Sequence, residues 1–365
     1  MSDMLHKMAI TRIPKVGGVL AKNLISYCGG AEEVFNAKKR DLLKVPGIGP
    51  VIAESILSQT VLHEAEAELE WVERHDIQPI FYLDNNYPLR LRPYEEAPLV
   101  LFYKGNTDLN ALRTVAIVGT RTPTERGKIV CEEIVEELKK HDVLVISGLA
   151  YGIDVTAHKK CVEMGVPTIG VLGHGLDQIY PPKHRNIGLE MCENGGLLTE
   201  FCYKTQAKRE HFPMRNRIIA AMCDALIVVE SGLGGGSIIT AKLGNKYGKP
   251  VFAVPGRLRD DYSKGCNMLI KSGKARLLES VDDIAKVLEW DTDKPAGPDF
   301  RDRSFDDLNE NEKIIANILK NVDDMSIDKI TFESRLPPST ISSVLLNLEF
   351  KGMVKNLPGK RYMLC

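Results

Sequence analysis

The candidate ligand-binding residues of this sequence lie in glycine-rich turns. Three such turns each follow a short apolar run and precede a segment of helical character. Glycine lets a backbone approach a phosphate closely, and the start of a helix offers free N–H groups to an anion. We therefore predict a site for a phosphate-bearing ligand, formed by the first and third turns through Gly119, Thr120, Arg121, Gly235, Gly236 and Ser237.

The glycine turns do not have the pattern of a nucleotide cofactor site. None is a P-loop, and none is a G-x-G-x-x-G turn followed by a ribose-binding acid at the usual spacing. Related Rossmann-type nucleotide hydrolases carry a glutamate just after a Gly-Gly-x-Gly-Thr run, whereas the run 234–241 has no carboxylate after its glycines. We expect no cofactor and no enzymatic turnover. The alternative is a nucleotide-processing enzyme related to the nucleoside monophosphate phosphoribohydrolases.

Asp154 and His158 are the nearest candidates for an acid–base pair. They are four residues apart, so a helix would place them on one face. In the simpler interpretation, which we favour, Asp154 caps the start of the helix and His158 packs beside it. His158 and His174 lack metal-ligand spacing, and the eight cysteines form no C-x-x-C pair. No metal site is predicted, and reduced thiols are typical of a cytoplasmic protein.

Basic residues are concentrated in three stretches of a chain whose net charge is −1. The stretches 121–128, 183–217 and 256–276 together hold sixteen basic and seven acidic residues. Because the chain as a whole is slightly acidic, a nucleic-acid binder of this composition must localise its basic residues. We expect the stretches to converge on a positive groove for a polyanion, although solvated loops remain the alternative. Phe212, just before Arg215, is the aromatic residue best placed to stack on a base.

Glycine hairpins near the N-terminus indicate a second, weaker candidate for phosphate contact. Gly47 and Gly49 permit the tight turn of a helix–hairpin–helix element, and Lys15 lies beside a degenerate first copy. The helix after such a turn can hold a phosphate without reading a base. A small helical domain that binds nothing explains the same residues, and both interpretations remain open.

A family resemblance is carried by motifs that occur in order along the central part of the chain. They are Val118-Gly-Thr-Arg121, 147–154 with His158, 173–177 with Tyr180-Pro181, 212–219, 236–240, and 254–256 with 265–267. With these motifs the chain resembles the DprA/Smf (DNA processing protein A) family. The N-terminal hairpins and the C-terminal module also match the longer members.

The resemblance implies a function as well as a fold. It implies an extended Rossmann domain that binds single-stranded DNA in a positive pocket, forms a homodimer and helps RecA recombinase assemble on DNA during natural transformation. By the same resemblance, Arg121 is the first choice for a phosphate contact. The next choices are Lys183, Arg185, Asn186, Arg215, Asn216 and Arg217.

Alternating strands and helices must position these turns. Short β-branched runs that are apolar on both sides indicate a parallel sheet covered by helices on both faces. The predicted strands are 115–118, 143–146, 168–172, 197–199, 226–229 and 251–254. We predict an α/β fold with a helix–hairpin–helix domain at 1–65, an extended Rossmann domain at 66–290, a linker at 291–305 and a winged-helix domain at 306–365.

The remaining expectations concern the C-terminal module and the surfaces. The expected wing turns at Pro358–Gly359, and the outer face of the preceding helix lacks Lys and Arg, so a protein-binding role is at least as consistent as DNA reading. No apolar run is long enough to span a membrane. An apolar set in a lysine-rich segment motivates a dimer of the central domain: Met268, Leu269, Ile270, Leu277 and Leu278.

Overall fold

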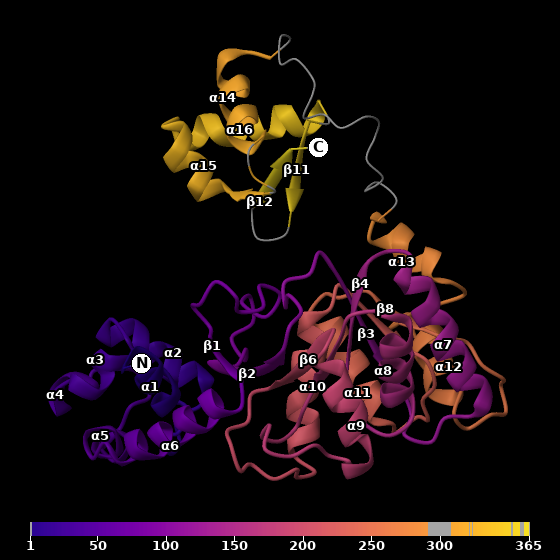
Figure 1. Cartoon of the computed structure of the whole chain (residues 1–365), viewed down its shortest axis with the longest axis horizontal. Helices are drawn as coiled ribbons and strands as arrows, with labels where there is room; N and C mark the ends of the chain where they lie inside the picture. The colour runs from indigo at the N-terminus through magenta and orange to yellow at the C-terminus, as the bar shows by residue number, and fades with distance from the viewer. Residues whose placement is uncertain are drawn as a thin grey trace. The chain divides into compact units, whose positions relative to one another are not determined.

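The computed structural model describes residues 2–290, 308–320, 322, 324–351, 353–357 and 361–364. Within them the chain forms two compact units, residues 1–288 and 289–365, which we describe separately (Figure 1). The linker expected at 291–305 and the turn expected at Pro358–Gly359 lie outside the described residues. In the described ranges, no helix is long and apolar enough to cross a membrane.

Six helices form the beginning of the first unit. They are α1 (Ser2–Ile10), α2 (Gly18–Cys28), α3 (Ala31–Asn36), α4 (Lys39–Leu42), α5 (Pro50–Leu57) and α6 (Thr60–Arg74). The predicted hairpin is present, since Gly47 has a φ of +86° and α5 begins directly after Gly49. A Cβ at Gly47 would lie 2.6 Å from Leu20, so the two hairpin copies pack closely. The boundary expected after residue 65 falls inside α6.

Two antiparallel strands join the helices to the sheet. β1 (Gln78–Phe81) pairs with β2 (Val100–Gly105), and β2 pairs with β6 (Gly195–Thr199). Alternate side chains of β2 point to opposite faces, so Val100 packs into the helical core and Leu101 into the sheet core. The strands β1 and β2 are therefore part of the sheet of the central domain.

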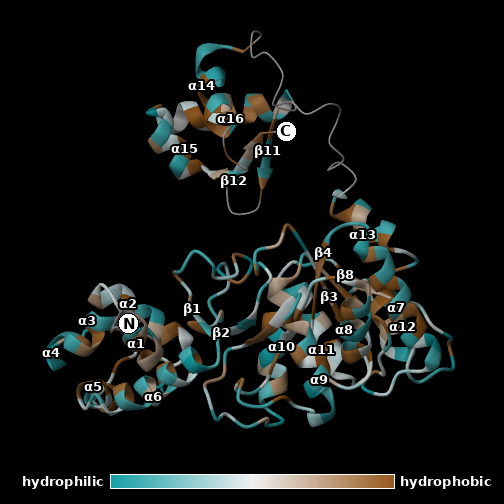
Figure 2. Cartoon of the chain, viewed as in Figure 1, coloured by the Kyte–Doolittle hydropathy of each residue, from teal (hydrophilic) through white to brown (hydrophobic). Residues whose placement is uncertain are grey.

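The central sheet has nine strands in the order β1-β2-β6-β5-β4-β3-β7-β8-β9. From β6 to β9 all neighbouring strands are parallel. The strands not yet given are β3 (Arg113–Val118), β4 (Val143–Ser147), β5 (Thr168–Val171), β7 (Ala225–Val228), β8 (Val251–Ala253) and β9 (Arg276–Leu277). The six predicted strands are confirmed, and their apolar runs form the buried centre (Figure 2).

Helices cover both faces of the sheet. They are α7 (Glu125–Lys139), α8 (Ile153–Met164), α9 (Arg185–Met191) after the short 3-10 turn η1 (Pro182–His184), α10 (His211–Met222), α11 (Gly236–Lys246), α12 (Lys264–Lys271) and α13 (Val281–Val287). Helices α8 and α10 both pack on β3, β4 and β5. Because two helices cannot cover the same strands from one side, α8 and α10 lie on opposite faces of the sheet. Strands β4, β5 and β6 lie on one side of β3, and β7, β8 and β9 lie on the other. A crevice outside the carboxyl ends of the strands is expected where the strand order reverses in this way.

The second unit is a winged helix, as predicted. It contains α14 (Glu310–Lys320), β10 (Met325–Ser326), α15 (Ile327–Ser334), α16 (Pro338–Phe350), β11 (Val354–Leu357) and β12 (Arg361–Leu364). Its sheet has the order β10-β12-β11, so one short strand was not anticipated. Ile315, Ile341 and Leu345 form its core together with Leu348.

The apolar set that motivated a dimer is mostly part of the core. Leu269 and Leu278 are buried, and Met268 and Ile270 pack against the sheet core. Only Leu277 is exposed, at 42%. Four of the five side chains are thus used in the core, by α12 and by the segment around β9, so this set does not argue for an interface.

Candidate functional site

A cavity of about 760 Å³ lies at the crevice between the ends of β3 and β7. The first glycine turn lines one side through Gly119, Thr120 and Arg121, and the third lines the other through Gly235, Gly236 and Ser237. The start of α10 closes it with Phe212 and Asn216. The structure therefore brings together residues predicted from three separate segments. Its volume is in the range of ordinary ligand sites.

A second cavity of about 730 Å³ adjoins the first at Arg121, which lines both. Lys128, Tyr151 and Lys159 also line it, with Glu132 as the one acidic side chain. Its positive charge and its aromatic ring are suited to a polyanion longer than one nucleotide.

Arg121 is exposed at the mouth of the first cavity and lies over an aromatic ring. Its guanidinium carbon is 5.5 Å from the centre of the Phe212 ring, within the range of a cation–π contact. Tyr180 lies 6.0 Å from the same ring and also lines the cavity. A cation beside two aromatic faces offers contacts to both a phosphate and a base.

The third glycine turn presents open backbone to the cavity. A Cβ at Gly234 or Gly236 would have no atom within 4 Å. Helix α11 begins at Gly236 without a side-chain cap. The Ile238 N–H donates to the Gly235 carbonyl oxygen at 3.1 Å, which leaves the N–H groups of Gly236 and Ser237 to face a ligand. The Ser237 hydroxyl donates to Ser231 at 2.7 Å, which leaves the backbone of Ser237 as the group to offer an anion.

Arg215 differs most from the expectation that it contacts the ligand. It is 3% exposed, and its guanidinium donates to the carbonyl oxygens of Gly148, at 2.6 Å, and Val171. Burial lowers the pKa of Arg215 to about 10, against the opposing charge of Asp154. The side chain therefore fastens α10 to the ends of β4 and β5 beneath the cavity.

Asp154 does not cap its helix, contrary to the simpler interpretation of the sequence. Gly152 is the residue before α8, and no side chain caps that end. Asp154 is 7% exposed and lies near the backbone of Ala150 and Gly148. Burial raises its pKa, and the charge of Arg215 opposes the rise.

His158 is fully buried and packs beside the sheet, as expected. Its Nδ1 lies 2.8 Å from the Thr168 hydroxyl, and its Nε2 has no hydrogen-bond partner among the described residues. Burial lowers the pKa of His158 from 6.5 to about 3, with a further contribution from the charge of Arg215. The imidazole is therefore neutral in the folded protein at neutral pH.

A measurable dependence of stability on pH follows from the buried His158. The unfolded imidazole takes up a proton below pH 6.5, whereas the folded one does not. Protonation therefore favours the unfolded chain, and the free energy of unfolding falls as the pH is lowered below 6.5. We expect the loss to reach about 2 kcal/mol at pH 5. Urea unfolding measures the free energy of unfolding at pH 7.5 and at pH 5. The difference between these two values should be smaller for His158→Gln than for wild type.

The matched control for His158 is His63→Gln, because the His63 side chain is 93% exposed. This control should keep the pH dependence of the wild type. Equal dependence in both variants would mean that His158 does not resist protonation in the folded protein.

Other basic residues of the sequence prediction do not line the main cavity. Lys183, Arg185 and Asn186 are exposed on η1 and α9. Arg217 pairs with Glu200 on the other side of α10. Of the sixteen basic residues in the three stretches, all of them described, only Arg121, Arg209 and Arg215 line this cavity. The first two stretches therefore meet at this cavity, whereas the stretch 256–276 contributes no residue to its lining.

Glu230 is a residue of the site that sequence reasoning did not single out. Its carboxylate accepts from the Thr124 hydroxyl at 2.6 Å and from the Thr124 N–H at 2.9 Å. Its carbonyl oxygen accepts from the Thr120 N–H at 2.7 Å. Both ends of the turn that carries Arg121 are thus tied to Glu230. In the sequence, Glu230 could have been identified as an acidic residue that comes directly after the predicted buried strand 226–229.

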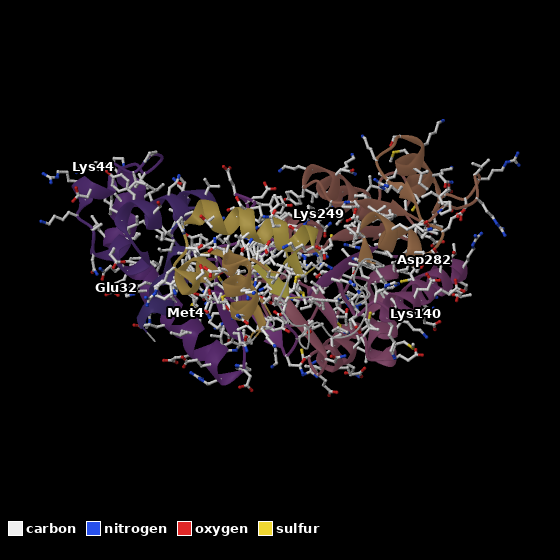
Figure 3. All side chains as sticks on the ribbon, turned by 90° about the horizontal axis from the view of Figure 1, so that it is seen from above. Met4, Glu32, Lys44, Lys140, Lys249 and Asp282 are labelled. Atoms are coloured by element: carbon white, nitrogen blue, oxygen red, sulfur yellow. The ribbon has the colours of Figure 1, made fainter. Side chains whose placement is uncertain are left out.

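The N-terminal hairpins are remote from this cavity. Gly47, Gly49 and Lys15 do not line it. Lys44, three residues before Gly47, lies at the opposite side of the first unit from Lys140 (Figure 3). Lys44 is itself paired with Asp41 at 2.7 Å. The hairpins therefore cannot contribute to the cavity by direct contact.

Family models match all three parts of the chain. The model described as DNA recombination-mediator protein A matches residues 78–289, the DprA winged helix domain matches 301–360, and the helix-hairpin-helix motif matches 10–64. Protein Smf of Synechocystis is 31% identical over 99% of this chain and 98% of its own length. DNA processing protein DprA of Streptococcus pneumoniae is 38% identical over 57% of this chain and 73% of its own.

Solved structures are similar as well. The crystal structure of DNA processing protein A from Streptococcus pneumoniae superposes with a TM-score of 0.68 and 30% identity over 77% of this chain and 97% of that one. DNA processing protein A from Helicobacter pylori, studied for its mode of binding single-stranded DNA, has a TM-score of 0.54 and 30% identity over 59% of this chain and 96% of that one.

Proposed function

Because this chain belongs to the DNA recombination-mediator protein A family, we propose that it binds single-stranded DNA in the crevice between β3 and β7. The observation that carries the proposal is the meeting of Arg121, Phe212 and the open backbone at Gly236 in one cavity. The Helicobacter pylori relative binds single-stranded DNA, which supports the same ligand class here.

The chemistry of the crevice suits a single strand better than a duplex. Phosphates would meet Arg121 and the free N–H groups at the start of α11. Unstacked bases would lie on Phe212 and Tyr180, and only a single strand offers such base faces without melting. The direct contacts that we propose are Gly119, Thr120, Arg121, Phe212, Asn216, Gly235, Gly236 and Ser237. Lys183, Arg185 and Asn186 would meet the strand only beyond the cavity.

The biological role that we propose is delivery of the bound strand to RecA recombinase during natural transformation, by a homodimer in the cytoplasm. This role rests on family membership. We propose no catalysis at the crevice. Asp154 lines the cavity but is only 7% exposed, His158 is fully buried and does not line it, and no carboxylate follows the glycines of the third turn. A nucleotide-processing enzyme is the alternative that the experiment must exclude.

Fluorescence anisotropy of a labelled oligo-dT, compared with a duplex of equal length, tests the proposal. We expect tight, salt-sensitive binding of the single strand, weaker binding of the duplex, and no release of base or ribose phosphate from nucleotides. Light scattering of the same sample tests the homodimer, and the rate of RecA filament formation on the bound strand tests the delivery. Equal affinity for duplex, or release of a base, would contradict the proposal.

Substitution of Gly236 should separate binding from folding. Since a Cβ at this position meets no atom of the chain, Gly236→Ala should leave the thermal unfolding temperature unchanged or slightly raised. The methyl group would instead occupy the path of a phosphate toward α11. We expect the affinity for oligo-dT to fall about tenfold, which corresponds to about 1.4 kcal/mol.

Gly49→Ala is the matched control for Gly236, because Gly49 lies at the start of helix α5, as its N-cap, and also has open space around its Cβ position. It should bind oligo-dT as the wild type does. If both substitutions weaken binding equally, the N-terminal hairpin also contacts DNA. If neither does, the third turn does not hold a phosphate.

A further inference from the structure

The loop between β6 and α10, residues 200–210, forms one wall of the proposed DNA-binding crevice. Ala207 and Arg209 line the cavity from this loop, and Lys204 and Lys208 are exposed on it. The loop has no regular secondary structure of its own. Its shape must therefore be set by contacts with neighbouring segments.

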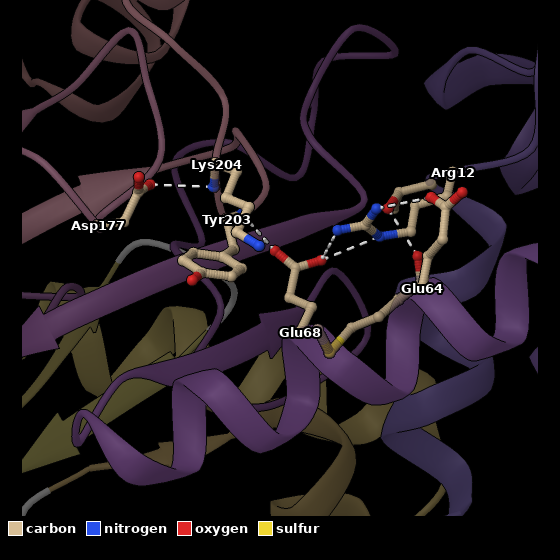
Figure 4. Close-up of polar contacts among 8 residues, drawn as sticks. Arg12, Glu64, Glu68, Asp177, Tyr203 and Lys204 are labelled. Carbon is tan, nitrogen blue, oxygen red and sulfur yellow. Dashed lines mark hydrogen bonds and ion pairs between the residues drawn. The ribbon is translucent and has the colours of Figure 1, made fainter.

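One of these contacts comes from the N-terminal helical segment through Glu68 of α6. One Glu68 oxygen accepts hydrogen bonds from Arg12 Nε and Nη2, at 3.1 and 2.7 Å. The other accepts from the backbone N–H of Tyr203 at 2.7 Å (Figure 4). Glu68 is 1% exposed. A single buried carboxylate thus joins the turn after α1, helix α6 and the loop.

Two further contacts hold the same part of the loop. The Tyr203 ring stacks on Trp71 of α6, with centres 4.4 Å apart and planes 14° from parallel. The Lys204 N–H donates to Asp177 at 3.0 Å, and Lys204 has a left-handed backbone with φ of +64° (Figure 4). The loop is therefore fixed at 203–204, a few residues before Ala207 and Arg209 reach the cavity.

The Glu68 contact is sensitive to the position of the loop. A buried carboxylate is stable only while its hydrogen bonds are made, since its desolvation is otherwise uncompensated. Moving the loop away would leave one Glu68 oxygen without a donor in a buried site. Packing of apolar surface alone would not impose this directional requirement.

We propose that Glu68 is a positioning residue for the DNA-binding crevice. By holding Tyr203, it places the wall that carries Arg209, so the helical segment completes the crevice without touching the bound strand. The inference rests on the proposed function, because it names a determinant of the same site. It also assigns a role to the N-terminal helices that does not require a DNA contact at their glycine hairpins.

The test compares Glu68→Ala with Glu64→Ala in the full chain. Glu64 is one turn earlier on α6 and bonds to Arg12 at 3.0 Å, but within the described residues it forms no hydrogen bond or ion pair with the loop, and its side chain is 64% exposed. We expect Glu68→Ala to weaken oligo-dT binding about tenfold, the order expected when one charge-assisted contact is misplaced, and Glu64→Ala to bind normally. Glu68→Gln keeps an acceptor for the Tyr203 N–H and should restore part of the affinity.

Limited trypsin digestion reports on the loop independently of DNA. Cleavage after Lys204, Lys208 and Arg209 should accelerate in Glu68→Ala and remain slow in Glu64→Ala. If Glu68→Ala fails to fold, Trp71→Ala, which removes the stacking on Tyr203 without stranding a charge, should show the same acceleration and a smaller loss of binding.

The outcomes distinguish the inference from the proposed function. If the wild type does not bind oligo-dT, the proposed function fails, whereas the digestion still shows whether Glu68 holds the loop. A folded Glu68→Ala variant with normal binding and normal resistance to trypsin would overturn the inference. So would a loss of binding without faster cleavage, because Glu68 would then act by another route.

Discussion

Replacement of Arg121 by glutamate should weaken oligo-dT binding about 100-fold, whereas removal of residues 306–365 should change it little. The charge reversal removes an attraction and adds a repulsion at the point where the two cavities meet. Each lost phosphate contact should also lower the slope of log affinity against log salt by about 0.7 for a single strand. The winged helix should leave this slope unchanged, since no Lys or Arg precedes Lys351 in its third helix.

Titration of labelled oligo-dT at several salt concentrations measures both quantities. Lys183→Glu is the matched comparison, because Lys183 is exposed and basic but does not line the main cavity. It should weaken binding less than Arg121→Glu does. If the truncation abolishes binding while Arg121→Glu leaves it intact, the winged helix is the DNA-binding element and the crevice is not.

Replacement of Arg215 by alanine should lower the free energy of unfolding by about 3–5 kcal/mol, the usual cost of removing one partner of a buried charge pair. The substitution would leave the buried Asp154 without its neighbouring positive charge. It would also remove the donors to the Gly148 and Val171 carbonyl oxygens. Binding of oligo-dT should fall as a consequence, because the floor of the cavity is no longer held.

Urea unfolding measures the stability of this variant, and two further variants sharpen the result. The double change Arg215→Met with Asp154→Asn should be less destabilising than the sum of the single changes, since it removes both buried charges. Arg209→Ala, at an exposed position lining the same cavity, should weaken binding without loss of stability. If Arg215→Ala unfolds like the wild type and still loses binding, Arg215 contacts the strand directly, as the sequence alone suggested.

Local sequence signals determined the elements of this protein. The strands of the central sheet were predictable because buried parallel strands must be apolar on both faces, and the runs at 143–146 and 226–229 have that composition. The glycine turns were predictable because their residues permit close backbone approach, and these turns do line the cavity through Gly119 and Gly236. The winged helix followed from the helical period of its apolar residues in the same way.

Which charged side chains share the site depends on contacts between segments that are distant in the sequence. Arg121 and Arg215 look alike in the sequence and both line the cavity, yet Arg121 is exposed and Arg215 is 3% exposed and bonded to backbone carbonyl oxygens. The face that a helix turns toward its neighbours depends on how distant segments pack, and local period does not specify that arrangement. The contact between Glu68 and Tyr203 joins residues 135 positions apart and has no local signature. Composition therefore predicted the elements and the phosphate-binding turns, while long-range packing selected the residues that shape the crevice.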